Sequence, residues 1–471
     1  MFTDQERYFG EWPAGMSLPG RERLASDGVT FTNHYCPAVM CTSSRSVILT
    51  GLQTPDNGMF ENVDMPYVAS MKPEIPTVGD MLRKSGYYTA YKGKWHLNSA
   101  FETAQPDHLF TKEMEAYGFS DYVWPGDVLT HTLGGYTYDN MIGGSAVSWL
   151  RDQGRTLADE NKPWALFVSL VNPHDIMYFN TDAPGQRVQD TGRLLMEAAR
   201  APQNALYEKS WDIPLPANLE QPMNEAGRPA AHGEFLKAWG YTLGNIPPEE
   251  ERWRRFNDFY LNSIRSVDQQ LALLLAELDA LKLADRTIVV FTSDHGETLG
   301  DHGLMYKGCR FYEGLVRVPL IFSWPAHFQG NKQNEALVEM MDLSASLLEL
   351  AGVELPDYFQ GKSLLPILSG ESDGASHREF VRCEYFDALD AHFTGGSGTY
   401  ATMHRTNRYK LCVYHGKGVG ELFDLEKDPW EHENLWDDPD HTGLKNQLLA
   451  ESFDAHVLLT TDVGSRRIAP M

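Results

Sequence analysis

The sequence predicts an α/β fold: a large, mostly parallel sheet sandwiched by helices, followed by a smaller C-terminal α+β subdomain that contains an antiparallel sheet. Over the first part of the chain, apolar runs that end in polar residues alternate with amphipathic patterns of helical period. Strands that alternate with helices form mainly parallel sheets that are covered on both faces. After position 370 the runs become short and alternating, which indicates antiparallel strands instead.

Five segments are expected to be strands of the main sheet. The clearest is TIVVFTSDHGE, because a continuous run of β-branched and aromatic residues is typical of a strand buried on both faces. In chain order the segments are 1–3, 87–96, 164–175, 287–297 and 318–325, and each leads into polar residues. Ligands collect at the carboxyl ends of the strands in such sheets. The polar ends therefore predict one shared pocket.

Apolar residues at helical spacing predict the elements that cover the sheet. A short helix follows Cys41, with Gly51 as its stop, and another spans 77–85, with Thr77 as its cap and Gly86 as its stop. Further helices are expected at 249–283, at 342–351 and near 441–455, and short antiparallel strands at 409–414 and 421–425.

These elements divide the chain into an α/β domain, 1–370, and a C-terminal subdomain, 371–471, of antiparallel sheet plus helix. Within the first domain, residues 177–250 are rich in Pro, Ala, Asn and Gln and have weak periodicity. Irregular segments of this length are usually functional or mobile. We therefore expect 177–250 to be an insertion over the pocket.

Composition limits the classes of partner. The formal net charge of −25 argues against nucleic acid, because phosphate binding needs clustered Lys and Arg. The five cysteines form neither a disulfide framework nor a CxxC zinc pattern. Neither an apolar run of about 18 residues nor a signal-peptide pattern occurs, so we expect a cytoplasmic protein without a membrane segment. If the chain is truncated at its start, a signal peptide could lie in the missing part. The sequence leaves open whether the protein forms a homo-oligomer.

Cys41 opens the stretch CTSSRSVILTG, in which a polar turn leads into a short helix. A thiol at a helix N-terminus, with Arg45 one turn further on, lies in positive potential that favours the reactive thiolate. An inert cysteine is more often surrounded by apolar neighbours. Cys41 is therefore a candidate for chemistry, with a structural role as the alternative.

Two strand ends carry residues that could bind a metal ion. Asp294 and His295 follow one apolar run, and Asp4 and Gln5 follow the first residues of the chain. Such oxygen and nitrogen donors suit a hard or borderline divalent cation, Ca²⁺ or Mn²⁺. The alternative for the Asp-His pair is a capping aspartate beside a solvent-facing histidine.

Three cationic residues, Arg45, Lys94 and Lys307, stand in polar strand ends or in loops after strands. Together with a metal they would form a positive cup inside an acidic protein, which fits a tetrahedral oxyanion ester, sulfate or phosphate. Surface charge is the alternative for any one of them. The candidates for proton transfer to or from a leaving group are His96, His174 and His302, with shaping of a loop as the alternative for His302.

Five segments together resemble the type I sulfatase family of the alkaline phosphatase superfamily, in the family's order and over essentially the whole chain. CTSSRSVILTG resembles the first sulfatase signature, C-x-P-S-R followed by a helix and Thr-Gly. GYYTAYKGKWHL resembles the second signature, and TSDHGETLGDHGLMYKG is similar to the metal-binding and lysine segment. RVPLIF and ELFDLEKDPWEHENL resemble late landmarks. The resemblance implies an alkaline phosphatase-like fold and the activity of a sulfuric ester hydrolase.

In this family the signature cysteine is oxidised to formylglycine. The resemblance therefore implies this modification at Cys41, and as a partner the enzyme that makes it, a formylglycine-generating enzyme or a radical maturase. The hydrated aldehyde attacks the sulfur of a small sulfated substrate, the alcohol leaves, and sulfate is then eliminated. The implied metal ligands are Asp4, Gln5, Cys41, Asp294 and His295. The implied catalytic residues are Cys41, Arg45, Asn62, Lys94, His96, His174 and Lys307.

The resemblance also assigns roles. Arg45 would steady the nucleophile, and Lys94 and Lys307 would hold the sulfate oxygens. His174 or Lys307 would protonate the leaving alcohol, and His96 would be the base that allows sulfate to leave.

The sequence departs from the family pattern at several positions. Ser43 stands where the signature usually has Pro, Gln5 where many members have Asp, and His295 where Asn is frequent. The last two changes, together with Asn62 in GMFEN, resemble the branch of choline sulfatases and phosphonate monoester hydrolases. Few residues of the family's central first strand precede Asp4, so the expectation is either a truncated chain or a fold that tolerates a stub.

Two other functions stay open. A phosphonate monoester or phosphodiester hydrolase would use the same site, although the resemblance to that branch does not extend to the Lys94–His96 pair, which favours sulfate. A non-catalytic protein that binds sulfate esters would result if Ser43 blocks the modification of Cys41. Carbohydrate, aryl and choline sulfates all remain candidate substrates.

Overall fold

The computed structural model describes residues 1–65, 67–103, 105, 107–127, 132–189, 198–325, 327–388 and 398–460. Its main sheet has seven strands in the order β3-β4-β1-β5-β6-β2-β7. They are β1 (Phe2–Asp4), β2 (Gly28–Tyr35), β3 (Tyr88–Gly93), β4 (Trp164–Pro173), β5 (Val289–Ser293), β6 (Leu320–Ser323) and β7 (Lys332–Glu339). Neighbours are parallel except where β6 is one of the pair, which confirms the mostly parallel sheet.

One predicted strand end lies at the wrong edge. The run 318–325 does form β6, but β6 is antiparallel to both β5 and β2. Its carboxyl end therefore lies at the edge opposite the other polar ends, and the prediction that it contributes to the shared pocket was wrong. An apolar run has no direction in its composition, so periodicity alone does not reveal this reversal.

Two strands of the sheet were not predicted. β2 is only partly buried along its middle, and its sequence GVTFTNHY contains several polar residues. β7 is the edge strand next to β2, and the first half of its sequence KQNEALVE alternates between half-buried and exposed positions. Edge strands carry polar residues on their exposed positions, which removes the continuous apolar run that marks a central strand.

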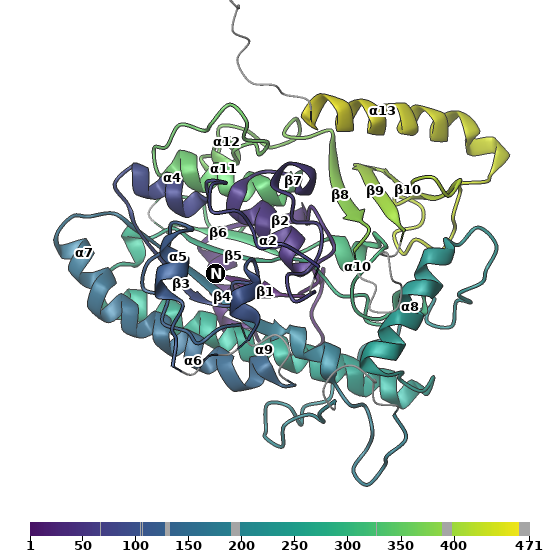
Figure 1. Ribbon diagram of the computed structural model, residues 1–471, viewed down its shortest axis with the longest axis horizontal. Coiled ribbons are helices and arrows are strands. Elements are labelled where there is room, and N and C mark those ends of the chain that lie inside the picture. Colours follow the sequence, from purple (N-terminus) through teal and green to yellow (C-terminus); the bar gives the residue numbers. More distant parts are fainter. Residues whose placement is uncertain are drawn as a thin grey trace, which may run out of the picture.

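Helices cover both faces of the sheet (Figure 1). On one face α1 (Pro19–Ser26) and α6 (Gly134–Trp149) pack against α9 (Glu250–Ala280), and α9 packs on β4. On the other face α2 (Cys41–Thr50) and α4 (Val78–Lys84) pack against α11 (Met340–Leu350). The shorter helices are α3 (Thr54–Asn57), α5 (Thr111–Glu115), α7 (Arg155–Asp159), α10 (Glu313–Val316) and α12 (Leu365–Leu368).

The predicted helices agree with the structure. The segments 77–85, 249–283 and 342–351 correspond to α4, α9 and α11. Thr77 caps α4 through a capping box with Asp80, as the sequence predicted for its start. α6 was not predicted, because its sequence GGYTYDNMIGGSAVSW is rich in glycine and has little helical periodicity.

The C-terminal sheet is antiparallel, with the order β11-β10-β9-β8, as predicted. Its strands are β8 (Phe380–Phe386), β9 (Tyr400–Thr406), β10 (Tyr409–Tyr414) and β11 (Val419–Asp424), and α13 (Thr442–Thr460) packs against β10. β8 is tied to the end of β2 by a bridge between Ala38 and Glu384. The boundary at 370/371 stays a prediction, and 389–397 and 461–471 of the predicted subdomain lie outside the described residues.

The predicted insertion at 177–250 is mostly irregular in its described part, which includes α8 (Ala230–Leu243). Residues 190–197 lie outside the described residues. Among the helices of the described residues, none is both long and apolar enough to cross a membrane.

The end of α2 depends on Gly51. This residue has a φ of 68° and its N–H donates to the Val47 carbonyl, which ends the helix in the left-handed cap that the sequence predicted. A Cβ atom at this position would lie 2.0 Å from the Phe359 ring. We expect Gly51→Ala to lower the free energy of unfolding by about 1–3 kcal/mol, through the left-handed conformation and the overlap. Urea unfolding measures the change, and Gly86→Ala, with open space around its Cβ, separates the conformational cost from the overlap.

Candidate active site

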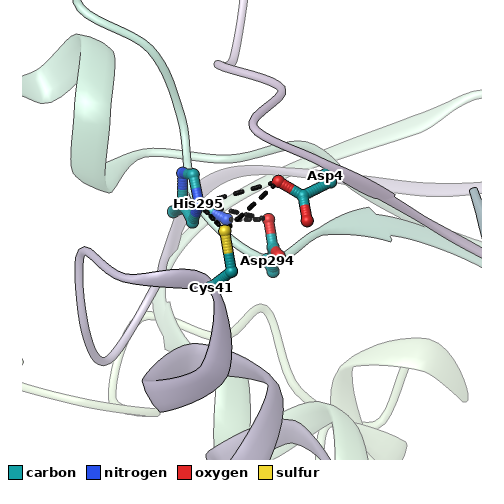
Figure 2. Close-up of side chains that lie close together, drawn as sticks. All are labelled: Asp4, Cys41, Asp294 and His295. Atoms are coloured by element: carbon teal, nitrogen blue, oxygen red, sulfur yellow. Dashed lines mark hydrogen bonds and ion pairs between the residues drawn. The ribbon is translucent and has the colours of Figure 1, made fainter. Parts of the chain in front are cut away.

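Four buried side chains from distant parts of the chain converge at the carboxyl edge of the main sheet. Asp4 ends β1, Asp294 and His295 follow β5, and Cys41 is the first residue of α2. Figure 2 shows the four side chains pointing toward one another. Their candidate ligand atoms all lie within 4.8 Å of one another. The parallel order β4-β1-β5 explains this convergence, because β1 and β5 end side by side.

The Cys41 thiol stands at the centre of this group. Its Sγ lies 3.1 Å from Nε2 of His295, and it donates to Oδ1 of Asp4 at 3.5 Å. The Lys307 ammonium donates to the same sulfur at 2.6 Å. Cys41 is fully buried and lies at the N-terminal, positive end of α2, so its surroundings favour a negatively charged or electron-rich group at this position.

Arg45 fixes the two carboxylates. Its Nε donates to Oδ2 of Asp294 at 2.9 Å, and its Nη2 donates to Oδ2 of Asp4 at 2.8 Å. Its Nη1 donates to the Ser169 hydroxyl at 2.9 Å, so β4 also holds the guanidinium. Lys94 forms an ion pair with the same Asp4 oxygen. Although burial alone raises the pKa of Asp4, the charges of Lys94, His174, Arg45 and Lys307 outweigh it and hold the pKa well below its usual range.

Gln5 and Lys307 complete the group of donors. The Gln5 amide donates from Nε2 to Glu297 at 2.5 Å, which leaves its Oε1 facing the Lys307 ammonium at 3.4 Å. The ammonium also lies 3.4 Å from Nε2 of His295. Burial acts to lower the pKa of Lys307, but Cys41 and the two aspartates nearby reverse the shift, and the pKa is raised.

The donor set fits a divalent cation. The candidate ligand atoms of two carboxylates, one imidazole and Cys41 lie close together. The Lys307 ammonium lies against Cys41, against His295 and against the amide oxygen of Gln5, which brings that oxygen to the same group. Carboxylate and amide oxygens are the ligands of hard cations such as Ca²⁺ and Mn²⁺. The residues that could hold the ion are therefore Asp4, Gln5, Cys41, Asp294 and His295.

The turn after β3 brings Lys94 and His96 to the same edge. His96 has a φ of 60°, an uncommon conformation for a residue with a side chain, and its carbonyl accepts a hydrogen bond from the Thr42 hydroxyl at 2.8 Å. Asn62 accepts from the Thr42 N–H at 3.2 Å, next to Cys41. Helix α2 therefore contacts both the histidine turn and Asn62.

His174 lies at the end of β4 and is buried. Burial, together with the charges of Lys94 and Lys307, holds the pKa of His174 well below its usual range, although Asp4 acts in the opposite direction. His302 does not join the group: its ring stacks on Tyr312 at 3.6 Å, and its Nδ1 lies 2.6 Å from Oε1 of Gln221.

One carboxylate that shapes the site was not predicted from the sequence. Asp127 is buried and accepts the backbone N–H groups of Trp95 at 2.7 Å and His96 at 2.6 Å. It therefore holds the turn that carries both Lys94 and His96. No local pattern marks Asp127, because it lies in an irregular segment.

We expect Asp127→Ala to lower kcat/KM for a sulfate ester by about 10- to 100-fold, because the strained turn loses both acceptors and the two side chains shift. Steady-state kinetics measures the loss. Asp121→Ala is the matched control, since the Asp121 carboxylate accepts hydrogen bonds from Tyr88 and Trp149, neither of which belongs to the site. Equal losses in the two variants would contradict this role for Asp127.

Comparison with known proteins identifies this arrangement. The family model described as "Sulfatase" matches residues 11–353, which is most of the chain. The chain belongs to the sulfatase family. A second model, described as "N-sulphoglucosamine sulphohydrolase, C-terminal", matches residues 300–456 of this sulfatase. The family membership and the fold predicted from the signature segments are therefore confirmed, and the chain is a sulfuric ester hydrolase.

Three of the similar curated proteins are bacterial sulfatases whose names give different substrates. The sulfatase is 27% identical to the choline-sulfatase of Rhizobium meliloti, with 92% of this chain and 80% of that protein covered. It is 25% identical to the N-acetylglucosamine-6-O-sulfatase of Bacteroides thetaiotaomicron, with 92% and 81% covered. It is 27% identical to the Delta 4,5-hexuronate-2-O-sulfatase of the same organism, with 96% and 87% covered.

Two solved structures show the same fold. One is a complex with the substrate D-glucosamine-2-N,6-O-disulfate, with a TM-score of 0.70 at 21% identity and 98% of each chain covered. The other is the phosphonate monoester hydrolase from Silicibacter pomeroyi, with a TM-score of 0.71 at 21% identity, and 98% of this chain and 95% of that chain covered.

Proposed function

We propose that this sulfatase hydrolyses a small sulfate monoester to an alcohol and inorganic sulfate, with a formylglycine formed from Cys41 and a divalent cation, Ca²⁺ before Mn²⁺. The observation that carries the proposal is the position of Cys41. Its sulfur contacts His295, Asp4 and Lys307 at one buried point of the sheet edge. Asp4 and His295 are potential ligands of the cation, and the ammonium group of Lys307 offers a positive charge to an anionic ester.

The cation would be held by Asp4, Gln5, Asp294 and His295 together with the modified Cys41. When bound, the cation would polarise an ester oxygen of the substrate and compensate the negative charges of the buried Asp4 and Asp294 carboxylates. Formylglycine supplies a nucleophile that can later expel its own sulfate ester, an exit that a serine hydroxyl lacks.

The other residues of the chain bind, orient and exchange protons. Lys94 and Lys307 would bind the sulfate oxygens, because both ammonium groups are buried beside Cys41 or Asp4. Arg45 keeps the two aspartates fixed. His174 or Lys307 would give a proton to the leaving alcohol, and His96 would take the proton whose removal releases sulfate.

The modification requires a partner that reads the unfolded chain. Cys41 has no exposed surface, and every residue of α2 around it is buried. A formylglycine-generating enzyme or a radical maturase would therefore act before the chain folds. Ser43, which replaces the usual proline, lies in the first turn of the helix, so its effect concerns recognition of the extended chain.

The substrate class is a small sulfated molecule. The names of the similar proteins include a choline sulfatase and two carbohydrate sulfatases, and we extend this range to carbohydrate, aryl and choline sulfates for the present chain. The Lys94–His96 pair supports sulfate over phosphonate as the reacting group.

The test compares kcat/KM for an aryl sulfate and an aryl phosphonate monoester with the same leaving group, using protein produced together with a formylglycine-generating enzyme. We expect the sulfate to be preferred, and a chelator to remove the activity until Ca²⁺ or Mn²⁺ is restored. A large preference for the phosphonate would assign the site to the alternative hydrolase. Binding of the sulfate ester without release of sulfate would indicate a non-catalytic protein.

A further inference from the structure

One buried carboxylate beside the active site, that of Glu297, has no role in the proposed chemistry. Glu297 lies two residues after His295 and is fully buried. Its Oε2 accepts a hydrogen bond from Nε2 of the Gln5 amide at 2.5 Å. Its Oε1 accepts the backbone N–H groups of Leu299, at 3.1 Å, and of Tyr306. All three partners are N–H donors, so the Glu297 carboxylate acts here only as an acceptor.

The two backbone hydrogen bonds fix where the Glu297 carboxylate lies. Leu299 and Tyr306 have left-handed backbone conformations, with φ of 53° and 66°, in the loop that leads from β5 to Lys307. Such conformations are uncommon for residues with side chains and persist where the surrounding structure holds them. The carboxylate joins the two sides of this loop, so its position is set by contacts that do not involve Gln5.

The backbone of Gln5 is fixed as well. It is left-handed, with a φ of 71°, and its N–H donates to Oδ1 of Asp294 at 3.1 Å. The Gln5 carbonyl accepts a hydrogen bond from the Tyr260 hydroxyl at 2.7 Å, and Tyr260 is a fully buried residue of α9. With the backbone held on both sides, the simplest movement left to the side chain is a half-turn of its amide, which exchanges the positions of Oε1 and Nε2.

The two ends of the Gln5 amide differ in chemistry, and only the oxygen suits a cation. An amide oxygen is a ligand of hard cations, whereas the NH₂ group is a hydrogen-bond donor. Oε1 faces the Lys307 ammonium, which also lies against Cys41 and His295. A half-turn would place the NH₂ group there and set the amide oxygen against the Glu297 carboxylate, two acceptors without a proton between them. The carboxylate therefore favours the orientation in which the oxygen faces the site.

We propose that Glu297 is a positioning residue that holds the Gln5 amide with its oxygen toward the cation. The inference rests on the proposed function, because it requires a cation in this site. Both oxygens of Glu297 are occupied by N–H donors, so Glu297 acts through Gln5 and not as a ligand itself. Partners of this kind, which orient a metal ligand without touching the metal, typically contribute about 10- to 100-fold to metal affinity.

The experiment turns the Gln5 amide over while the loop keeps its hydrogen bonds. In Glu297→Gln, the new side chain keeps its oxygen toward the N–H groups of Leu299 and Tyr306, so its NH₂ group faces the Gln5 amide. That amide then turns, and its own NH₂ group points to the cation site. We expect the Kd for Ca²⁺ to rise about 10- to 100-fold. Isothermal titration calorimetry measures it on chelator-treated protein produced with a formylglycine-generating enzyme, with Mn²⁺ in a separate titration.

A second substitution restores the arrangement. In the double variant Gln5→Glu with Glu297→Gln, the new carboxylate at position 5 accepts a hydrogen bond from the amide at position 297 and offers its other oxygen to the cation. The net charge of the two positions equals that of the parent. We therefore expect a Kd within about threefold of the parent value, as coupled substitutions of two contacting residues allow. A residue that only held the loop would give no such rescue.

The matched control is Glu384→Gln. Glu384 is also a buried carboxylate, but it lies on β8, and its Oε2 accepts the Thr54 hydroxyl at 3.1 Å. Since neither residue belongs to the active site, we expect the Kd for Ca²⁺ to stay at the parent value in this variant.

An unchanged Kd in Glu297→Gln, a loss that the double variant does not restore, or an equal loss in Glu384→Gln would overturn this role of Glu297 and leave the proposed function intact. A parent protein that binds neither Ca²⁺ nor Mn²⁺ would overturn both. If Glu297→Gln does not fold, the double variant is compared with Gln5→Ala. Binding near the parent value in the double variant, with at least about tenfold weaker binding in Gln5→Ala, would support the proposal, and equally weak binding in the two would overturn it.

Discussion

Replacement of Cys41 by alanine is expected to lower kcat/KM for a sulfate ester by about 10⁴-fold or more, because the methyl side chain of alanine cannot be converted to formylglycine and the nucleophile is never formed. The substitution also removes the group against which Lys307 and His295 are placed. Loss of the nucleophile alone costs most of the rate in enzymes whose catalytic residues act as a unit. Protein produced with the modifying enzyme, assayed on an aryl sulfate, gives the measurement.

The matched control is Cys412→Ala. Cys412 is also buried, but it lies on β10 of the C-terminal sheet and outside the active site. We expect its kcat/KM to stay near that of the unmodified sequence, with a small loss of stability from the lost volume. Activity of Cys41→Ala within tenfold of the parent would contradict the assignment of Cys41 as the origin of the nucleophile.

Replacement of Arg45 by methionine is expected to lower the free energy of unfolding by about 3–5 kcal/mol, the usual cost of breaking a buried ion pair by removing one partner. Both carboxylates that Arg45 contacts are fully buried, as is its own side chain. Methionine fills much of the same volume, so the loss reports the unpaired charges of Asp4 and Asp294 more than a cavity. Urea unfolding of chelator-treated protein measures it without a contribution from a bound cation.

Arg23→Met provides the comparison at the surface. Arg23 forms a two-hydrogen-bond pair with Asp279, but both side chains are well exposed, at 34% and 52%. Exposed pairs contribute about 0–1 kcal/mol, so we expect a change in that range. If Arg45→Met cost no more than Arg23→Met, the buried carboxylates would have another source of compensation, and Arg45 would not be the residue that fixes them.

Much of the active site could be predicted because a parallel sheet gathers its carboxyl ends. The polar residues after β1, β3, β4 and β5 were placed in one pocket from their position alone, and the structure brings Asp4, Lys94, His174 and Asp294 together there. Lys307 was expected in the same pocket from its place in the loop after β5, and the signature segments added its role toward the sulfate oxygens.

The features that were missed depend on long-range geometry. The direction of β6 is set by how the chain returns between β5 and β2, and an apolar run carries no such information. The role of Asp127 arises from two backbone N–H groups that only the fold brings to its carboxylate. His302 is a candidate for proton transfer from the sequence, with shaping of its loop as the alternative, and in the structure its ring packs on Tyr312.

The most direct test of the account is the mass of the tryptic peptide Leu24–Arg45, which contains Cys41. The protein would be produced in its native host and, separately, together with a formylglycine-generating enzyme. We predict that the thiol side chain of Cys41 is converted to an aldehyde in at least one preparation, with the same peptide captured by a hydrazide reagent. An unmodified thiol in both preparations would contradict the account, and the site would then have to act without formylglycine or bind sulfate esters without cleaving them.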